Sequence, residues 1–123
     1  MKKLVTLIID DSLIIIERFI EILNEMDNIE TVVYANNYTE GLQMLEDIKP
    51  DIALLDINLP DKSGIELLRI IRQQGFDTKV IMITNQATDH YKKVCATLGS
   101  NYFFDKSNEF EQIPAIISAI LLN

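Results

Sequence analysis

The stretch PDIALLDINLPDKSGIELL, residues 50–68, joins an apolar run to an acidic residue, a loop and a helix start. Residues 52–55 are apolar without interruption, which is typical of a strand covered on both faces of a sheet. Ser63, followed three residues later by Glu66, has the pattern of a capping box that opens a helix. The stretch therefore predicts a buried strand, a loop that begins with Asp56, and a helix from Ser63 onward.

The same alternation of strand and helix extends along the chain in both directions. Pro50 and Gly75 stand where helices are expected to have ended, and Asn37 with Glu40 is a weaker helix start. The last helix, over 113–122, has a start signal at Asn108 or Ser107. The other strand candidates are residues 4–9, 29–34, 80–83 and 102–104. Five strands alternating with helices predict an α/β fold with a mostly parallel sheet.

Size and charge bound the function. The chain has 123 residues, of which 48% are apolar and 24% charged, so we expect a single globular domain over 1–123, alone or within a longer protein. The net charge of −8 disfavours direct nucleic-acid binding. Apolar runs are too short for a membrane span or a signal peptide, and the single cysteine, Cys95, is compatible with a reducing cytoplasm. We interpret Cys95 as a packed core residue and His90 as an exposed residue near a helix start.

Acidic residues follow two of the expected strands. Asp10 and Asp11 come after the first strand and Asp56 after the third. Ligands of open α/β sheets bind beyond the carboxyl ends of the strands, so these carboxylates share one crevice if the two strands are neighbours. Oxygen ligands without histidine or cysteine favour Mg²⁺. Thr84 and Lys106 end the fourth and fifth strands, and the set fits a metal-assisted phosphoryl site.

The chain resembles the receiver domains of bacterial two-component response regulators, and the resemblance covers nearly its whole length. The resemblance lies in IIDDS (residues 8–12), in the stretch 50–68, in VIMIT (residues 80–84) and in FFDKS (residues 103–107). It implies a doubly wound, flavodoxin-like sheet of five parallel strands in the order 2-1-3-4-5, with five helices. It also implies a cytoplasmic protein that catalyses only its own phosphorylation and dephosphorylation.

The resemblance assigns roles to the acidic residues. Asp56 is similar to the phosphoacceptor of the family. Asp11, Asp56 and the backbone carbonyl of Asn58 would bind Mg²⁺ directly, and Asp10 would act mainly through a metal-bound water. The phosphodonor would be a histidine kinase or a phosphotransfer protein, and an output domain or target protein would read the result.

The resemblance also implies a switch, with three departures from the usual pattern. Lys106 would contact the phosphoryl group, Thr84 would move toward it, and the aromatic side chain of Phe103 would follow, changing the surface of the last two helices and the strand between them. Phe103 replaces a frequent tyrosine, and Tyr102 should face the opposite side of the sheet. Ser107 replaces a frequent proline. Asn85 stands where a small residue is common and is expected either to crowd the approach of the phosphodonor or to hold a water that hydrolyses the acyl phosphate.

The helix expected over 12–26 carries more apolar residues than one core stripe needs. The core stripe is expected to be Ile15, Phe19, Ile22, Leu23 and Met26. Ile16 and Ile20, together with Ile14, are then left for another face. This face is either part of a broad buried surface or a docking surface for the kinase.

Three other functions compete with this interpretation. An FMN-binding flavodoxin needs a phosphate loop rich in glycine, serine and threonine after the first strand, where this chain has DDSL. An aspartyl phosphatase typically has Asp-x-Asp after the first strand, where this chain has Asp10-Asp11-Ser12. The sequence has no Walker-type glycine-rich loop, so ATP is not the expected direct phosphodonor. A receiver-like interaction module that works without phosphorylation stays open as the alternative.

Overall fold

The computed structural model describes residues 4–122, over which strands and helices alternate. The strands are β1 (Leu4–Ile9), β2 (Ile29–Ala35), β3 (Ile52–Asp56), β4 (Lys79–Thr84) and β5 (Tyr102–Asp105). The helices are α1 (Leu13–Asn24), α2 (Tyr38–Ile48), α3 (Gly64–Gln73), α4 (Asp89–Thr97), the 3₁₀ turn η1 (Phe110–Gln112) and α5 (Ile113–Leu121). The five strands predicted from the sequence are confirmed, with ends that differ by one residue at most.

The strands form one parallel sheet in the order β2-β1-β3-β4-β5, which confirms the order that the family resemblance implied. From β1, the chain first adds β2 on one side and then crosses to add β3 on the other side. β1 and β3 lie side by side, with Ile9 opposite Leu55. β4 continues beside β3, and Thr84 at its end lies opposite Asp105 of β5. The carboxyl ends of β1, β3 and β4 therefore meet at one edge of the sheet.

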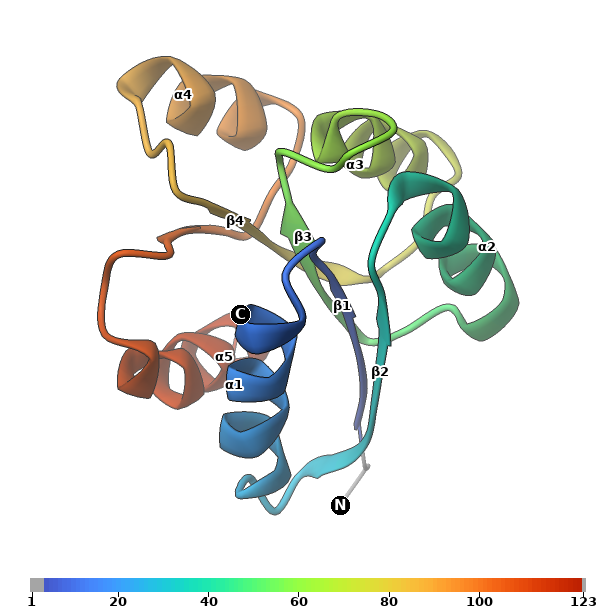
Figure 1. The fold of residues 1–123 in the computed structure, drawn as a ribbon. Helices are drawn as coiled ribbons and strands as arrows, with labels where there is room; N and C mark the ends of the chain where they lie inside the picture. The colour runs from blue at the N-terminus through green and yellow to red at the C-terminus, as the bar shows by residue number, and fades with distance from the viewer. Residues whose placement is uncertain (1–3, 123) are drawn as a thin grey trace.

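Helices cover both faces of the sheet. Figure 1 shows α1 and α5 together on one face, with α2 and α3 on the other. The core under α1 and α5 contains Phe19 and Phe104, and the second core contains Leu45, Leu68 and Cys95. Because both faces are covered, β3 is buried at every position, as its unbroken apolar run predicts.

The predicted helix starts are confirmed in part. The side chain of Asn37 caps α2 by accepting a hydrogen bond from the Glu40 amide at 2.8 Å. Ser63 caps α3, but its hydroxyl accepts from the Ile65 amide, and Glu66 pairs with Arg69 instead of completing a capping box. Each start is therefore placed correctly, although the partner at the second differs from the capping-box pattern.

The predicted start of the last helix at Asn108 or Ser107 is wrong. The 3₁₀ turn η1 follows Glu109 and precedes α5, and no side chain caps either element. The aromatic ring of Phe110 explains the later start, because it is buried and stacks on Phe19 with 4.7 Å between ring centroids. Tertiary packing of this ring, rather than a local cap, therefore sets where α5 begins.

The predicted face of α1 also needs correction. Ile16 is only 1% exposed and belongs to the core with Phe19 and Leu23, so the prediction that it docks a kinase is wrong. Ile20 is partly buried against the same core. The helix packs against both the sheet and its neighbour α5, which widens its buried face beyond one stripe. Ile14 remains exposed, at 73%.

The two residues given structural interpretations lie as expected. His90 is exposed in the first turn of α4, and Cys95 is fully buried, where burial raises the pKa of its thiol to about 11. Over residues 4–122, every helix is too short or too polar to cross a bilayer.

Candidate phosphoryl and metal site

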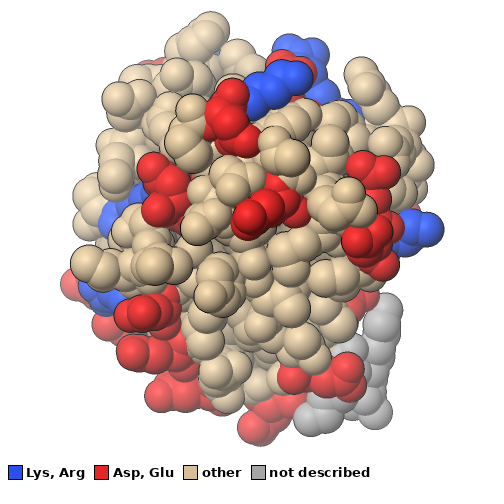
Figure 2. Space-filling model, turned by 45° about the vertical axis from the view of Figure 1, so that its right-hand side comes forward, with Lys and Arg blue, Asp and Glu red and all other residues tan. Residues whose placement is uncertain are grey.

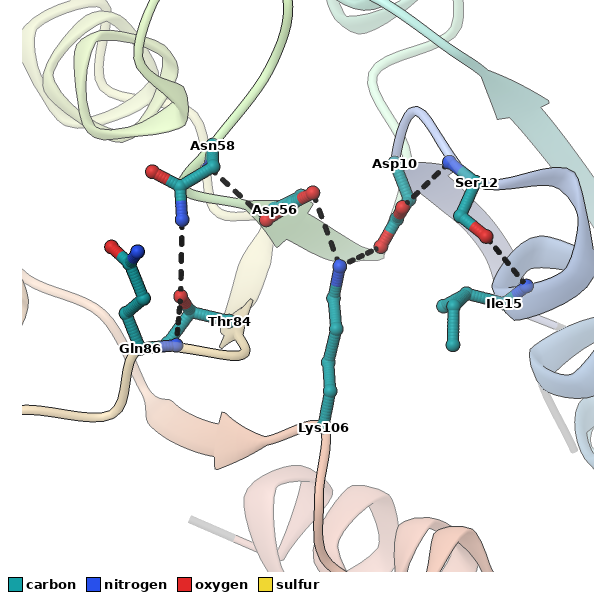
Figure 3. Close-up of polar contacts among 8 residues, drawn as sticks. All are labelled: Asp10, Ser12, Ile15, Asp56, Asn58, Thr84, Gln86 and Lys106. Carbon is teal, nitrogen blue, oxygen red and sulfur yellow. Dashed lines mark hydrogen bonds and ion pairs between the residues drawn. The ribbon is translucent and has the colours of Figure 1, made fainter.

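The carboxyl edge of the sheet brings four predicted residues together. Asp10 follows β1, Asp56 ends β3, Thr84 ends β4 and Lys106 follows β5. Figure 3 shows the Lys106 side chain extending across this edge, with its ammonium group between Asp10 and Asp56. Parallel strands make this convergence possible, because every strand delivers its last residue to the same side.

Lys106 forms ion pairs with both carboxylates. Its Nζ contacts Oδ2 of Asp10 directly and lies 3.1 Å from Oδ2 of Asp56. The three side chains are nearly inaccessible to solvent, with exposed fractions of 5% for Lys106, 0% for Asp10 and 3% for Asp56. One cation therefore faces two buried carboxylates, which leaves the cluster with an excess of negative charge.

The pKa values reflect this imbalance. Burial, followed by the charge of Asp10, raises the pKa of Asp56 to about 6. Burial likewise raises the pKa of Asp10, against the opposing effect of Lys106. Burial lowers the pKa of Lys106, but its hydrogen bond to Asp10 and the two carboxylate charges outweigh burial and raise it. A second cation would favour the ionised form of both carboxylates.

Asp11 completes a group of carboxylates that fits a metal ion. One carboxylate oxygen from each of Asp10, Asp11 and Asp56 lies within 4.8 Å of the others, and Asp11 is exposed to solvent. Oδ1 of Asp10 accepts the Ser12 amide at 2.9 Å, which fixes its side chain at the start of α1. The ligand set consists of hard oxygen atoms with one open side, as Mg²⁺ requires.

The loop after β3 is held close to Asp56. The Asn58 amide donates to Oδ1 of Asp56 at 3.1 Å, and the Gly64 amide donates to the Ile57 carbonyl at 2.8 Å. A β-carbon at Gly64 would lie 1.9 Å from the carbonyl oxygen of Asp56. Only glycine therefore lets the start of α3 pack against the end of β3.

Thr84 is held by two donors. Its hydroxyl oxygen accepts the Gln86 amide at 3.0 Å and the side-chain amide of Asn58 at 3.5 Å, and the residue is fully buried (Figure 3). Asn58 thus contacts Asp56 through its backbone and Thr84 through its side chain. The sequence identified Thr84 and Asn58, but it gave no sign that they are hydrogen-bonded to each other.

The residues around the expected switch lie on different faces. Phe103 is half-buried against the second core, the one that contains Leu68 and Cys95. Tyr102 is exposed in a groove with Ala115 and Ile116 of α5. The prediction that the two aromatic side chains face opposite sides is confirmed. The peptide between Lys106 and Ser107 is trans. Asn85 lies just beyond β4 with an exposed side chain.

Asp61 is a residue of this region that the sequence analysis missed. Its carboxylate accepts hydrogen bonds from the first residues of α2, which lie 22 and 23 positions earlier in the chain. A contact over this distance leaves no local pattern, because the helix already has a cap candidate of its own in Asn37. A structure is needed to find it.

The surface is predominantly acidic. Figure 2 shows acidic side chains spread over one face of the molecule, with few basic side chains between them. This distribution agrees with the net charge of −8. It offers no basic stripe that would follow a phosphate backbone on the face shown.

The sequence matches the family model described as the response regulator receiver domain over residues 6–118. It is 30% identical over 113 residues to the DNA-binding transcriptional activator EvgA of Escherichia coli K12, covering 92% of this chain and 55% of EvgA. It is 32% identical over 106 residues to protein-glutamate methylesterase/protein-glutamine glutaminase 3 of Geobacter sulfurreducens, covering 86% of this chain and 28% of that enzyme. The chain thus spans about half or less of the length of these relatives.

Solved structures share the fold at lower identity. The chain superimposes on CheY in the CheX-CheY-BeF3-Mg complex of Borrelia burgdorferi with a TM-score of 0.90 and 22% identity, covering 99% of this chain and 92% of the other. For the response regulator domain of Thermotoga maritima CheB, the TM-score is 0.84 at 22% identity, with coverage of 98% and 96%. At these identities the likeness shows the fold.

Proposed function

The chain belongs to the response regulator receiver domains of two-component signalling, and we propose that it accepts a phosphoryl group on Asp56 from a histidine kinase or a phosphotransfer protein. The observation that carries this proposal is the buried Asp56 carboxylate, 3.1 Å from the Lys106 ammonium and beside two further carboxylates. One ammonium group does not neutralise three carboxylates, so the cluster favours the binding of a further cation.

The chain's own residues perform the transfer as follows. An Asp56 carboxylate oxygen attacks the phosphorus atom, an acyl–phosphate bond forms, and the donor's bond to phosphorus breaks as the donor departs with its electron pair. Lys106 neutralises charge on the phosphoryl oxygens, and the Thr84 hydroxyl donates a hydrogen bond to one of them. Hydrolysis by water returns the carboxylate.

Asp11, Asp56 and the backbone carbonyl of Asn58 would hold Mg²⁺, with Asp10 acting through water. When bound, Mg²⁺ supplies positive charge to the phosphoryl oxygens and fixes the geometry of transfer.

Replacing Asp11 with Asn removes one ligand and one charge at an exposed position. We expect Asp11→Asn to fold normally and to lose Mg²⁺-dependent phosphorylation, and full activity would contradict the ligand set.

Thr84 provides the route from the site to the surface. To reach the phosphoryl group, its hydroxyl must leave the Asn58 side chain and the Gln86 amide. This frees space toward which Phe103 turns, altering the surface of α4, β5 and α5 that an output domain or target protein would read. Amide NMR shifts on adding beryllofluoride should reach α4 and β5, and shifts confined to residues around Asp56 would contradict this switch.

Docking of the phosphodonor is expected beside the start of α1. Ile14 is 73% exposed and its neighbour Leu13 is 54% exposed, close to the loop that carries Asp10 and Asp11. Exposed apolar side chains next to a reactive carboxylate offer a contact surface for the donor protein. We place this encounter in the cytoplasm, where two-component kinases present their phosphohistidine.

The decisive test is incubation with Mg²⁺ and a small acyl-phosphate donor, followed by intact mass spectrometry. One phosphoryl adduct should form in the wild type and disappear in Asp56→Asn. The control is Asp77→Asn, which removes an exposed carboxylate after α3 and should keep the adduct. No adduct in any variant would favour the alternative, a receiver-like interaction module that works without phosphorylation.

A further inference from the structure

The carboxylate of Asp61 caps a helix in a different part of the chain. Its Oδ1 accepts the Tyr38 amide at 2.8 Å, and its Oδ2 accepts the Thr39 amide at 3.1 Å and the Thr39 hydroxyl at 3.0 Å. Tyr38 and Thr39 are the first two residues of α2. The side-chain oxygen of Asn37 accepts the next amide, that of Glu40, so Asp61 satisfies the two helix amides that precede it.

Asp61 belongs to the loop between β3 and α3, which includes Asn58. The two ends of this loop are fixed by backbone contacts: the Ile57 amide donates to Ile83, and Asn58 bridges to Ser63. The middle of the loop is fixed by side chains. Leu59 is 9% exposed, Asp61 binds α2, and the Lys62 ammonium lies 5.1 Å from the centre of the Tyr38 ring.

We propose that Asp61 is a positioning residue for the phosphorylation site: it anchors the loop to α2 and so presents the Asn58 carbonyl to Mg²⁺. This inference rests on the proposed function, because it assigns a purpose to the loop only if the loop holds the metal. Without the anchor, the loop samples more conformations, and metal binding must then order it at a cost in affinity. Groups that orient metal ligands typically change metal affinity by about 10- to 100-fold when removed.

Two simpler explanations must be separated from positioning. Asp61 stabilises α2 as a cap, and any loss of stability could weaken the site indirectly. Its negative charge could also attract Mg²⁺ through space. Asn37→Ala is the matched control for the first, because it removes a cap from the same helix and leaves the loop anchor intact. Asp61→Asn addresses the second, because it removes the whole charge but keeps an oxygen for the Tyr38 amide.

The experiment compares the wild type with Asp61→Ala, Asp61→Asn and Asn37→Ala in three measurements. These are the Mg²⁺ dissociation constant from amide NMR shifts, amide hydrogen exchange of residues 57–63 in the metal-free protein, and phosphorylation by a small donor at increasing Mg²⁺. We expect Asp61→Ala to raise the dissociation constant about tenfold and to speed exchange in the loop. Saturating Mg²⁺ should restore its phosphorylation rate, and Asp61→Asn should lie between it and the wild type.

Asn37→Ala should lower the melting temperature as much as Asp61→Ala does while leaving Mg²⁺ affinity and loop exchange unchanged. Equal weakening of Mg²⁺ binding in Asn37→Ala and Asp61→Ala would overturn the inference in favour of helix capping. Equal weakening in Asp61→Asn and Asp61→Ala, with unchanged loop exchange, would overturn it in favour of charge. Absence of both Mg²⁺ binding and an adduct in the wild type would refute the proposed function itself, and this inference with it.

Discussion

Each end of the sheet has a cationic side chain among its contacts, and the two side chains have different kinds of partner. At the amino end, the Arg72 guanidinium of α3 donates to the carbonyls of Gly99, Phe76 and Thr78 at 2.9, 3.2 and 2.9 Å, and to the Asn101 side chain at 2.9 Å. These hydrogen-bond acceptors are all neutral, and the negative charge of Asp77 nearby favours the charged guanidinium. At the carboxyl end, Lys106 faces two buried carboxylates.

This difference indicates a structural role for Arg72, whereas Lys106 lies in the proposed phosphoryl site. Arg72 joins α3, the loop before β4 and the loop before β5, and it needs nothing further. The carboxyl end is short of positive charge, with carboxylate pKa values raised by burial. A protein keeps such an imbalance at a cost in stability, and here it is the feature on which the proposed cation binding and phosphoryl transfer depend.

Removing the cation at the amino end should have the largest effect on stability. Arg72→Met leaves three backbone carbonyls and the Asn101 oxygen without this donor, and we expect the free energy of unfolding to fall by about 3 kcal/mol in urea denaturation. Mg²⁺ affinity should not change. Arg69→Met on the same helix loses only a 3.4 Å surface pair and should cost less than about 1 kcal/mol. Equal losses in the two variants would contradict the structural role of Arg72.

Neutralising Asp56 at the carboxyl end should instead raise the free energy of unfolding. The pKa of Asp56 is about 6 in the folded protein against 3.8 for a free side chain, so the folded state holds a proton that the unfolded state has released between these values. Its ionisation therefore lowers the free energy of unfolding as pH rises from about 4 to about 6, by about 3 kcal/mol. Asp56→Asn removes this penalty.

We accordingly expect metal-free Asp56→Asn to be more stable than the wild type at pH 7, and its stability to vary less between pH 4 and 6. Mg²⁺ should stabilise the wild type at pH 7 more than the variant, because it binds the ionised carboxylate. Melting temperatures with and without Mg²⁺ across this pH range give the measurement. A variant less stable than the wild type at neutral pH would show that the ion pair with Lys106 outweighs the imbalance.

The sequence was sufficient for the carboxyl end and insufficient for the amino end. Asp10, Asp56 and Thr84 each end an apolar run, Lys106 comes two residues after another, and a parallel sheet collects such positions at one edge. Arg72 reaches Gly99 and Asn101, 27 and 29 residues further along the chain, and no periodicity encodes that contact. Asp61 was missed for the same reason.

Burial on α1 was a different kind of error. The apolar residues of this helix allow several stripes, and the position of α5 decides which of them faces the core. The sequence left Ile16 open between a broad buried face and a docking surface, and the structure places it in the buried face. Helix periodicity therefore indicates that a helix has a buried face, and the neighbouring helix determines how wide that face is.

A neutral buried group within β1 extends the comparison between the ends. Thr6 is fully buried, and its hydroxyl has no hydrogen-bond partner among the described residues. Thr6→Val keeps the shape and removes the unpaired hydroxyl, so we expect a gain of about 1 kcal/mol in the free energy of unfolding. Thr78→Val is the matched control, because that buried hydroxyl donates to the Pro50 carbonyl at 2.8 Å and its loss should destabilise. Destabilisation in both variants would mean that the Thr6 hydroxyl has a partner.

The smallest effect is expected at the rim of the carboxyl end, where Asn85 follows Thr84 with an exposed side chain. Crowding by this side chain would hinder an approaching phosphodonor and an attacking water alike, because both need the same opening above Asp56. We expect Asn85→Ala to accelerate phosphorylation by a small donor and spontaneous dephosphorylation together, each by about threefold, or less than 1 kcal/mol in each barrier. Adduct formation and decay, followed by intact mass, provide both rates. Faster phosphorylation with slower hydrolysis would instead show that the Asn85 amide holds the attacking water, and two unchanged rates would place its side chain outside the path of either reactant.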